Sequence, residues 1–256
     1  MIDSGVPIRA ASRTLSILRT INELGSASLS QIARHERLPL PTAFRFVQTL
    51  VHEGMIARDP SGKCYYPTAL VQSLASGYDN SVVRQVAEPI LSRLTRDVGW
   101  PVFLSERVGR RFVIRATTHP ETTLTFFNWK VGSSFPVLGS VTGLVWLAFQ
   151  SESAVRDLIA WERAAESSQD IPDVDDLLHT LEKVRMAGYA LRPSPYEKNG
   201  KTASIALPIC PDAHASDVLT LTYFAAAMKP DEAVQRFVGR LRETAVQIAG
   251  ALAPSV

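Results

Sequence analysis

Residues 28–53 read SLSQIARHERLPLPTAFRFVQTLVHE, and this stretch predicts two short helices separated by a tight turn. Ser28 stands at the N-cap position of the first helix, where its side-chain oxygen can accept a hydrogen bond from a free backbone N–H. The apolar face of that helix consists of Leu29, Ile32 and Ala33. Pro39 ends the helix, because proline lacks a backbone donor and disfavours the helical conformation in the preceding residue.

The second helix begins at Pro41, whose missing N–H costs nothing in a first turn. Its buried face has the spacing i, i+3, i+4, i+7 and consists of Ala43, Phe46, Val47 and Leu50. The opposite face consists of Pro41, Phe44, Arg45 and Gln48, flanked by Thr42 and Thr49. An Arg can bind guanine, a Gln can bind adenine, and an apolar ring can contact a thymine methyl group, so this face has the chemistry of major-groove readout. The alternative is an ordinary surface helix that carries one exposed phenylalanine.

A β-hairpin is predicted directly after these two helices. Its strands are Met55–Arg58 and Lys63–Tyr66, and the intervening Asp-Pro-Ser-Gly favours a turn. A helix-turn-helix followed at once by a hairpin indicates a winged helix. Arg58 and Lys63 near the hairpin tip are candidate DNA contacts, whereas a hairpin that only covers the small core would not need a basic tip.

Ile8 to Leu24 is predicted to be a helix that precedes the helix-turn-helix. Its buried side is expected to consist of Ala11, Leu15, Leu18, Ile21 and Leu24. Arg9 and Arg13 lie one turn apart near its start, where they either contact phosphate or form a solvated face. Ser28 adds a third candidate, because the N–H groups at a helix N-terminus can bind a phosphate.

Positive charge is concentrated at the N-terminal end of this 256-residue chain. Residues 1–78 hold eight Lys or Arg against five Asp or Glu, a net charge of +3, which leaves −1 for the remainder of a chain whose total is +2. A basic module on a near-neutral body is typical of a protein that meets a polyanion with one end only.

The two cysteines, Cys64 and Cys210, are far apart and show no metal-binding or disulfide spacing. The chain also lacks a signal-peptide pattern and any apolar run long enough to span a bilayer. We therefore expect a soluble cytoplasmic protein with no membrane partner, no metal and no cofactor.

Residues 68–79 are expected to link two domains, with a short helix over Thr68–Tyr78 and a boundary near Asp79. The predicted domains are residues 1–67 for DNA binding and residues 80–256 for effector binding and oligomerisation. Asn80 and Ser81 should cap a helix over Val82–Val98, in which Pro89 should produce a kink or a break.

The second domain is predicted to be α+β, an antiparallel sheet covered by helices. Six strands are expected, over Val102–Arg107, Arg111–Thr117, Thr123–Asn128, Tyr189–Arg192, Thr202–Ile209 and Val218–Phe224. Besides the helix over Val82–Val98, four helices are expected, over Thr142–Phe149, Ser153–Ala165, Asp173–Ala187 and Asp231–Leu252.

No pattern of catalytic residues is present in this domain, and its histidines, His119, His179 and His214, are scattered. A ligand-sensing role is the better interpretation. The candidate loop opens a helix with small residues and consists of Leu138, Gly139, Ser140, Val141, Thr142 and Gly143. Such a loop leaves room for a ligand and directs N–H groups at a carboxylate, although a plain helix cap would look the same. Ser204, Thr220 and Thr222 could add hydroxyls from facing strands.

Three segments together resemble the IclR family of bacterial transcriptional regulators, and the likeness covers nearly the whole chain. They are SLSQIARHERLPLPTAFRFVQTLVHEGMIARDPSGKCYYPT, VGSSFPVLGSVTGLVWLAFQ and ASIALPI. The resemblance implies a winged helix-turn-helix, a linker helix and a GAF-like effector domain. It also implies homodimers, often paired into homotetramers, on a roughly palindromic operator in double-stranded DNA.

By position, the resemblance assigns recognition-helix contacts to Pro41, Thr42 and Arg45. It assigns effector contacts to residues 138–143 and to Ser204, Thr220 and Thr222. Phe44 departs from the family, in which polar residues are usual at this position, so the operator preference should differ there.

Residues 113–149 most resemble the subgroup that regulates the catabolism of hydroxyphenylpropionate and related aromatic acids, which implies an aromatic-acid effector. Arg115 could pair with such an acid, or it could be an exposed strand residue.

The sequence thus predicts a ligand-responsive transcription factor and not an enzyme. Two alternatives stay open: an enzyme with an accessory winged domain, dependent on Cys210 or His119, and a winged-helix module that binds proteins.

Overall fold

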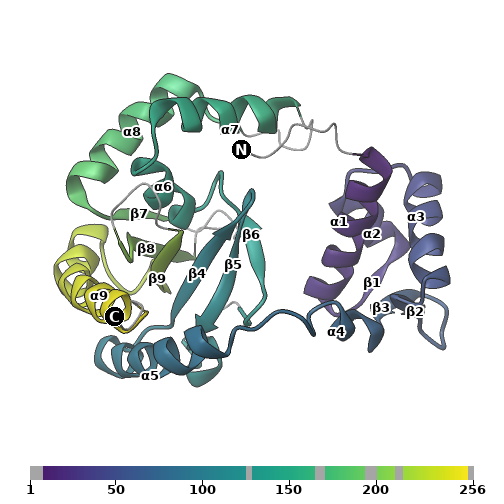
Figure 1. The fold of residues 1–256 in the computed structure, drawn as a ribbon, viewed down its shortest axis with the longest axis horizontal. Helices are drawn as coiled ribbons and strands as arrows, with labels where there is room; N and C mark the ends of the chain where they lie inside the picture. The colour runs from purple at the N-terminus through teal and green to yellow at the C-terminus, as the bar shows by residue number, and fades with distance from the viewer. Residues whose placement is uncertain (1–7, 125–128, 165–170, 194–200, 211–215, 253–256) are drawn as a thin grey trace. The chain divides into compact units, whose positions relative to one another are not determined.

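The computed structural model describes residues 8–124, 129–164, 171–193, 201–210 and 216–252. The chain divides into two compact units, residues 1–79 and residues 80–256, each with its own sheet (Figure 1). This is the α+β class that the sequence predicts, and the fold class is confirmed.

The first unit is a winged helix-turn-helix. Its helices are α1 (Arg9–Leu24), α2 (Leu29–His35) and α3 (Leu40–His52). Its antiparallel strands, in the order β1-β3-β2, are β1 (Ala27–Ser28), β2 (Ile56–Arg58) and β3 (Cys64–Pro67). The buried core consists of Ile17, Leu18, Ile21, Ala27, Ile32, Val47, Leu50, Ile56 and Tyr65.

The side of α1 that faces this core differs from the prediction. Leu15 and Leu24 are 63% and 53% exposed, whereas the polar Thr20 is buried. The Thr20 hydroxyl donates to Glu36 Oε1 at 2.6 Å, in the turn that follows α2. This contact places the Thr20 side of α1 inward and leaves the two leucines at the surface.

The turn between α2 and α3 contains a left-handed residue, Arg37, with φ 53°. Such a conformation costs a non-glycine residue about 1–2 kcal/mol. Two backbone hydrogen bonds offset this cost, from Leu38 N–H to Ala33 O at 2.8 Å and from Glu36 N–H to Ile32 O at 2.9 Å. They satisfy carbonyl groups that the end of α2 would otherwise leave unpaired.

The linker is less helical than predicted, because only α4 (Leu70–Ser73) is helix. The next residues form turns with i→i−3 bonds, such as Ala75 N–H to Gln72 O at 3.1 Å. No residue of α4 is buried. The hydroxyls of Ser73 and Ser76 bond to carbonyls three residues earlier, which competes with regular helix.

The second unit contains a six-stranded antiparallel sheet with the order β6-β5-β4-β9-β8-β7. Its strands are β4 (Val102–Val108), β5 (Arg111–Thr117), β6 (Ser134–Pro136), β7 (Ala190–Pro193), β8 (Thr202–Pro208) and β9 (Asp217–Phe224). The central pair, β4 and β9, places Phe103 opposite Thr220.

The third strand lies later in the chain than the predicted Thr123–Asn128. Thr123 and Leu124 form a bend, and residues 125–128 lie outside the described residues. The strand is β6 instead, because Phe135 pairs with Phe112 and their rings stack with centroids 5.9 Å apart.

Helices form a layer on each face of the sheet (Figure 1). The layer on one face is formed by α5 (Ser81–Val98) and α9 (Pro230–Leu252), which enclose a core with Leu104, Leu221 and Tyr223. The layer on the other face consists of α6 (Val141–Ala148), α7 (Glu152–Ala164) and α8 (Val174–Ala187), whose core includes Phe103, Phe112 and Val218.

Helix α5 differs from the prediction in two features, its course at Pro89 and its N-terminal cap. It runs without interruption through Pro89, which is exposed. Asn80 occupies the N-cap position but its side chain makes no cap hydrogen bond. Asn80 Nδ2 instead donates to the Arg115 carbonyl at 2.8 Å, and Arg115 Nε donates to Asn80 Oδ1 at 2.6 Å. The side-chain amide of Asn80 therefore bonds to Arg115 of β5 and does not cap α5.

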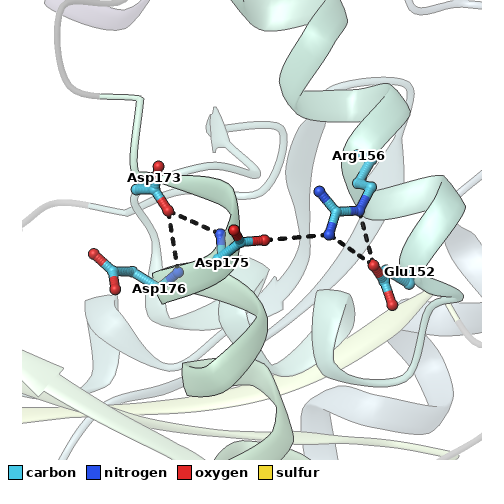
Figure 2. Close-up of polar contacts among 5 residues, drawn as sticks. All are labelled: Glu152, Arg156, Asp173, Asp175 and Asp176. Carbon is cyan, nitrogen blue, oxygen red and sulfur yellow. Dashed lines mark hydrogen bonds and ion pairs between the residues drawn. The ribbon is translucent and has the colours of Figure 1, made fainter.

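Arg156 on α7 links α7 to α8 at the surface (Figure 2). Its guanidinium contacts Glu152 on the same helix at 2.8 Å and Asp175 on α8 at 3.2 Å. Asp173 caps α8 by accepting from the N–H groups of Asp175 and Asp176, at 2.9 and 3.3 Å. Because these side chains are exposed to solvent, the ion pairs contribute little to the free energy of unfolding.

Candidate functional site

The first candidate site is the exposed face of α3. Ala43, Val47 and Leu50 are buried in the core of the first unit. Arg45 and Gln48 are on the opposite side and exposed, and within the described part of the chain their side chains form no hydrogen bond or ion pair. Their polar groups are therefore free to bind another molecule.

The remaining predicted contacts on α3 surround this pair. Pro41 is exposed and Thr42 is half-buried. Phe44 is 45% exposed, although an aromatic ring is normally buried. The Thr49 hydroxyl donates to the Arg45 carbonyl at 3.1 Å, so it is bound to the helix itself. The free groups of the face are thus one guanidinium, one amide and one aromatic ring.

The hairpin holds its basic residues with a rigid turn. Asp59 Oδ1 accepts from the N–H groups of Lys63 and Cys64, at 2.8 and 3.1 Å, and Oδ2 accepts from Ser61 Oγ at 2.7 Å. These bonds, with the one from Ser61 as the largest cause, lower the pKa of Asp59. The Arg58 guanidinium lies 5.8 Å from the centroid of the Tyr65 ring, while Lys63 extends into solvent.

The three N-terminal candidates have different surroundings. Arg9 is exposed at the start of α1. Arg13 donates to the Glu36 carbonyl at 3.2 Å, so one of its donors connects α1 to the turn of the helix-turn-helix. Ser28 forms a capping box with Gln31, in which Ser28 N–H donates to Oε1 at 2.8 Å and Ser28 Oγ accepts from Gln31 N–H at 3.3 Å. Two of the N–H groups near this helix start are thereby satisfied internally.

The second candidate site is a set of buried hydroxyls between α6 and the sheet. Thr142 Oγ1 on α6 lies 3.0 Å from Thr220 Oγ1 on β9. Ser204 Oγ on β8 lies 3.0 Å from Thr222 Oγ1. All four side chains are at least nine-tenths buried. Since buried polar groups cost free energy unless they are paired, these contacts keep a polar site intact inside an apolar layer.

At the start of α6, Gly143 makes room for the backbone of the preceding loop. A Cβ atom built on Gly143 would lie 1.8 Å from the Val137 carbonyl oxygen. Ser140 Oγ caps the helix by accepting from Gly143 N–H at 2.9 Å, and it donates to the Val137 carbonyl at 3.1 Å. Leu138 is half-buried, and Gly139 is exposed with φ +87°. The N–H groups of Val141 and Thr142 are the ones left to face a ligand.

Arg115 lies apart from these hydroxyls. The β4–β5 register shifts between Leu104 and Ser105, which leaves Arg115 as the extra residue of a bulge in β5. Its guanidinium forms an ion pair with Glu106 and bonds Asn80, so it holds the start of α5. The structure does not bring Arg115 together with Thr142, Thr220, Ser204 or Thr222.

His119 is a buried residue that the sequence patterns do not assign to effector binding. It follows β5 in a short 3-10 turn, η1 (His119–Glu121), and is 3% exposed. Its Nδ1 lies 2.8 Å from Thr117 Oγ1, and its ring centroid lies 6.0 Å from that of Phe103. Burial lowers its pKa to about 4. Within the described residues, His119 Nε2 is buried and has no hydrogen-bond partner.

Cys210 is half-buried and packs against the core below α9. Among the described residues, no three His, Cys, Asp or Glu side chains are close enough together to bind a metal ion. No helix among them is long and apolar enough to cross a membrane.

A winged helix-turn-helix with a free Arg–Gln face, joined to a domain with a buried polar site, is the architecture of a DNA-binding transcriptional regulator. Residues 10–60 match the IclR helix-turn-helix domain, and residues 76–250 match the domain described as bacterial transcriptional regulator IclR C-terminal. The chain belongs to the IclR family of bacterial transcriptional regulators. The relatives that it matches are transcriptional regulators and not enzymes.

Individual relatives agree with this assignment. The HTH-type transcriptional regulator KipR of Bacillus subtilis is 23% identical over 198 residues, which cover 77% of this chain and 78% of KipR. An IclR family regulator from Brucella abortus has a TM-score of 0.70 and 24% identity, over 98% of this chain and 97% of its own. An IclR homologue from Microbacterium hydrocarbonoxydans, solved with 4-hydroxybenzoate, has a TM-score of 0.63 and 23% identity, over 96% and 100% of the chains.

Proposed function

We propose that this regulator binds a palindromic operator as a homodimer or homotetramer and that a small aromatic acid controls its affinity for that operator. The operator would lie beside genes for the catabolism of the same acid. A protein with this function acts in the cytoplasm, where the operator DNA is.

The observation that carries the DNA-binding part is the free polar face of α3. Arg45 can form two hydrogen bonds to guanine, Gln48 can form two to adenine, and Phe44 can contact a thymine methyl group. Arg9, Arg58 and Lys63 are exposed cations that can bind phosphates, with Thr42, Pro41 and the N-terminus of α2 as additional contacts. Arg13 retains further donors for the same purpose, since its guanidinium has five N–H groups.

The buried hydroxyl site supports the effector part of the proposal. The pairs Thr142–Thr220 and Ser204–Thr222 can exchange partners with a polar ligand, and the two N–H groups that begin α6 favour a carboxylate. The Microbacterium homologue, with the same fold, was solved with an aromatic acid, 4-hydroxybenzoate. An aromatic acid is therefore the ligand class that we propose for this chain.

Effector binding would act by changing the balance between two arrangements of the subunits. A ligand shifts such an equilibrium only by the difference between its affinities for the two arrangements. One arrangement would hold two α3 helices at the spacing of successive major grooves, and the other would not.

The proposal is tested in two steps. Purified protein is screened by thermal shift against benzoate, 4-hydroxybenzoate, phenylacetate and 3-(4-hydroxyphenyl)propionate, with cyclohexanecarboxylate as a non-aromatic control. DNase footprinting on the DNA beside its own gene then follows, with and without each ligand that binds. We expect a symmetrical footprint that an aromatic acid strengthens or weakens. A footprint that is absent would refute the DNA-binding role, and a footprint that no acid alters would refute the effector class.

A further inference from the structure

We propose that His119 binds the effector, and that its Nε2–H donates a hydrogen bond to an oxygen atom at the end of the ligand opposite the carboxylate. This inference rests on the proposed function and adds a residue, a hydrogen-bond direction and a requirement on the ligand. The proposed ligand is then an aromatic acid that carries a further oxygen substituent on its ring, such as a phenolic hydroxyl, besides its carboxylate.

The sheet register places the relevant side chains in a row. Thr220 on β9 is opposite Phe103 on β4, and Phe103 is opposite Thr117 on β5. Residues directly opposite each other in antiparallel strands have side chains on the same face. Thr142 contacts Thr220 at one end of the row, and His119 contacts Thr117 at the other.

The length and chemistry of this row suit an aromatic ligand with two polar ends. Two strand spacings of about 4.8 Å separate Thr220 from Thr117, so the ends lie about 10 Å apart. Phe103 lies between them, with its ring 5.9 Å from that of Phe135 and edge-on to it. An aromatic ring in the middle of the row would gain a favourable aromatic contact from Phe103.

The hydrogen bonds of Thr117 favour the tautomer of His119 that carries its proton on Nε2. Thr117 Oγ1 accepts from the backbone N–H of His119 at 3.2 Å and lies 2.8 Å from Nδ1. The Thr117 hydroxyl can act as acceptor and donor at once: its oxygen accepts the backbone N–H, and its own proton is donated to Nδ1. The proton of the neutral ring is then on Nε2, which makes Nε2 a donor.

This buried donor allows His119 to discriminate between ligands with and without an oxygen atom at that position. Within the described residues Nε2 has no partner, and an unsatisfied buried polar group is costly. A ligand oxygen at this point removes the cost, whereas a hydrogen atom on the ligand leaves it in place. Because burial keeps the ring uncharged at neutral pH, His119 selects for a hydrogen-bond acceptor and not for negative charge.

Isothermal titration with 4-hydroxybenzoate and benzoate tests the inference on the full-length protein. The variant His119→Asn keeps an amide near Nδ1 for Thr117 but has no atom at the Nε2 position, whereas His119→Gln can place an N–H there. His179→Asn, on the exposed side of α8, is the matched control. We expect the wild type and the control to prefer 4-hydroxybenzoate by about 10-fold or more, His119→Asn to lose that preference, and His119→Gln to keep most of it.

A second measurement needs no variant. In long-range ¹H–¹⁵N spectra of the wild type, 4-hydroxybenzoate should shift the His119 Nε2 resonance and benzoate should leave it near its unliganded position. An unchanged preference in His119→Asn, or an Nε2 resonance indifferent to both acids that bind, would overturn the role of His119 and leave the proposed function standing. A wild type that binds no aromatic acid would overturn both.

Discussion

At the scale of single residues, the burial of His119 should be visible in the pH dependence of folding. Its pKa is about 4 in the folded protein and near 6.5 when unfolded. Between these values the unfolded chain binds a proton that the folded chain does not, so stability is highest above pH 6.5 and falls as the pH falls toward 4. From pH 7 to pH 5, this single group should remove about 2 kcal/mol from the free energy of unfolding.

The comparison of wild type with His119→Gln isolates this contribution. All four tryptophans lie in residues 80–256, so tryptophan fluorescence during urea unfolding reports on the second unit alone. The wild type should lose about 2 kcal/mol more than the variant over that pH interval. Equal losses would mean that His119 is not buried in the neutral form.

The roles of individual residues could be predicted from the sequence only where they depend on near neighbours. Ser28 was expected to cap α2, and its bond with Gln31 is a local one. The sequence predicts phosphate or solvent around Arg13 and an acid or solvent around Arg115. In the structure each contacts a residue at least nine positions away, Glu36 and Glu106 respectively. Sequence patterns report on residues two to four positions apart, and both partners are much farther away in the sequence.

At the scale of secondary-structure elements, the start of α6 depends on the absence of a side chain at Gly143. An alanine there would bring Cβ into the Val137 carbonyl, a fixed backbone group that cannot move aside cheaply. We expect Gly143→Ala to lower the free energy of unfolding of the second unit by about 2 kcal/mol or more.

Gly239→Ala on α9 is the matched control. Gly239 is exposed in the middle of a helix, and a Cβ atom there would meet nothing within 4 Å. This change should stabilise by about 0.5–1 kcal/mol, because alanine favours helix over glycine. Urea unfolding followed by tryptophan fluorescence measures both. Two variants of equal stability would show that Gly143 is not packed against the backbone.

The elements that the sequence predicts well are those set by local periodicity. The buried side of α3, with Ala43, Val47 and Leu50, follows directly from helical spacing. The strand β6 was missed because its place depends on Phe135 packing against Phe112, more than twenty residues away. The linker forms less helix than its pattern predicts, because no residue of α4 is fully buried and the hydroxyls of Ser73 and Ser76 bond to nearby carbonyls.

At the scale of the whole molecule, the basic first unit should make operator binding strongly dependent on salt. If Arg9, Arg13, Arg58 and Lys63 of two subunits each displace a counterion from a phosphate, eight contacts give a slope of about −7 in a plot of log K against log salt concentration. Fluorescence anisotropy of a labelled operator between 50 and 300 mM potassium chloride measures this slope. A slope near zero would show that phosphate contacts do not hold the complex together.

The same experiment with Lys63→Ala examines the hairpin. Removing one cation from each of two subunits should reduce the slope by about 2 and weaken operator and unrelated DNA alike. A loss confined to the operator would instead place Lys63 against a base.

The affinity of Arg45→Ala for the footprinted operator tests the central claim most directly, with Arg163→Ala as a control of equal charge. Arg163 is exposed on α7 in the second unit. Anisotropy titrations at one fixed salt concentration should show a loss of about 1–3 kcal/mol for Arg45→Ala, with reduced discrimination against a mutated half-site. The control should bind within about two-fold of the wild type. Wild-type affinity and discrimination in Arg45→Ala would contradict the assignment of the exposed α3 face as the surface that reads DNA.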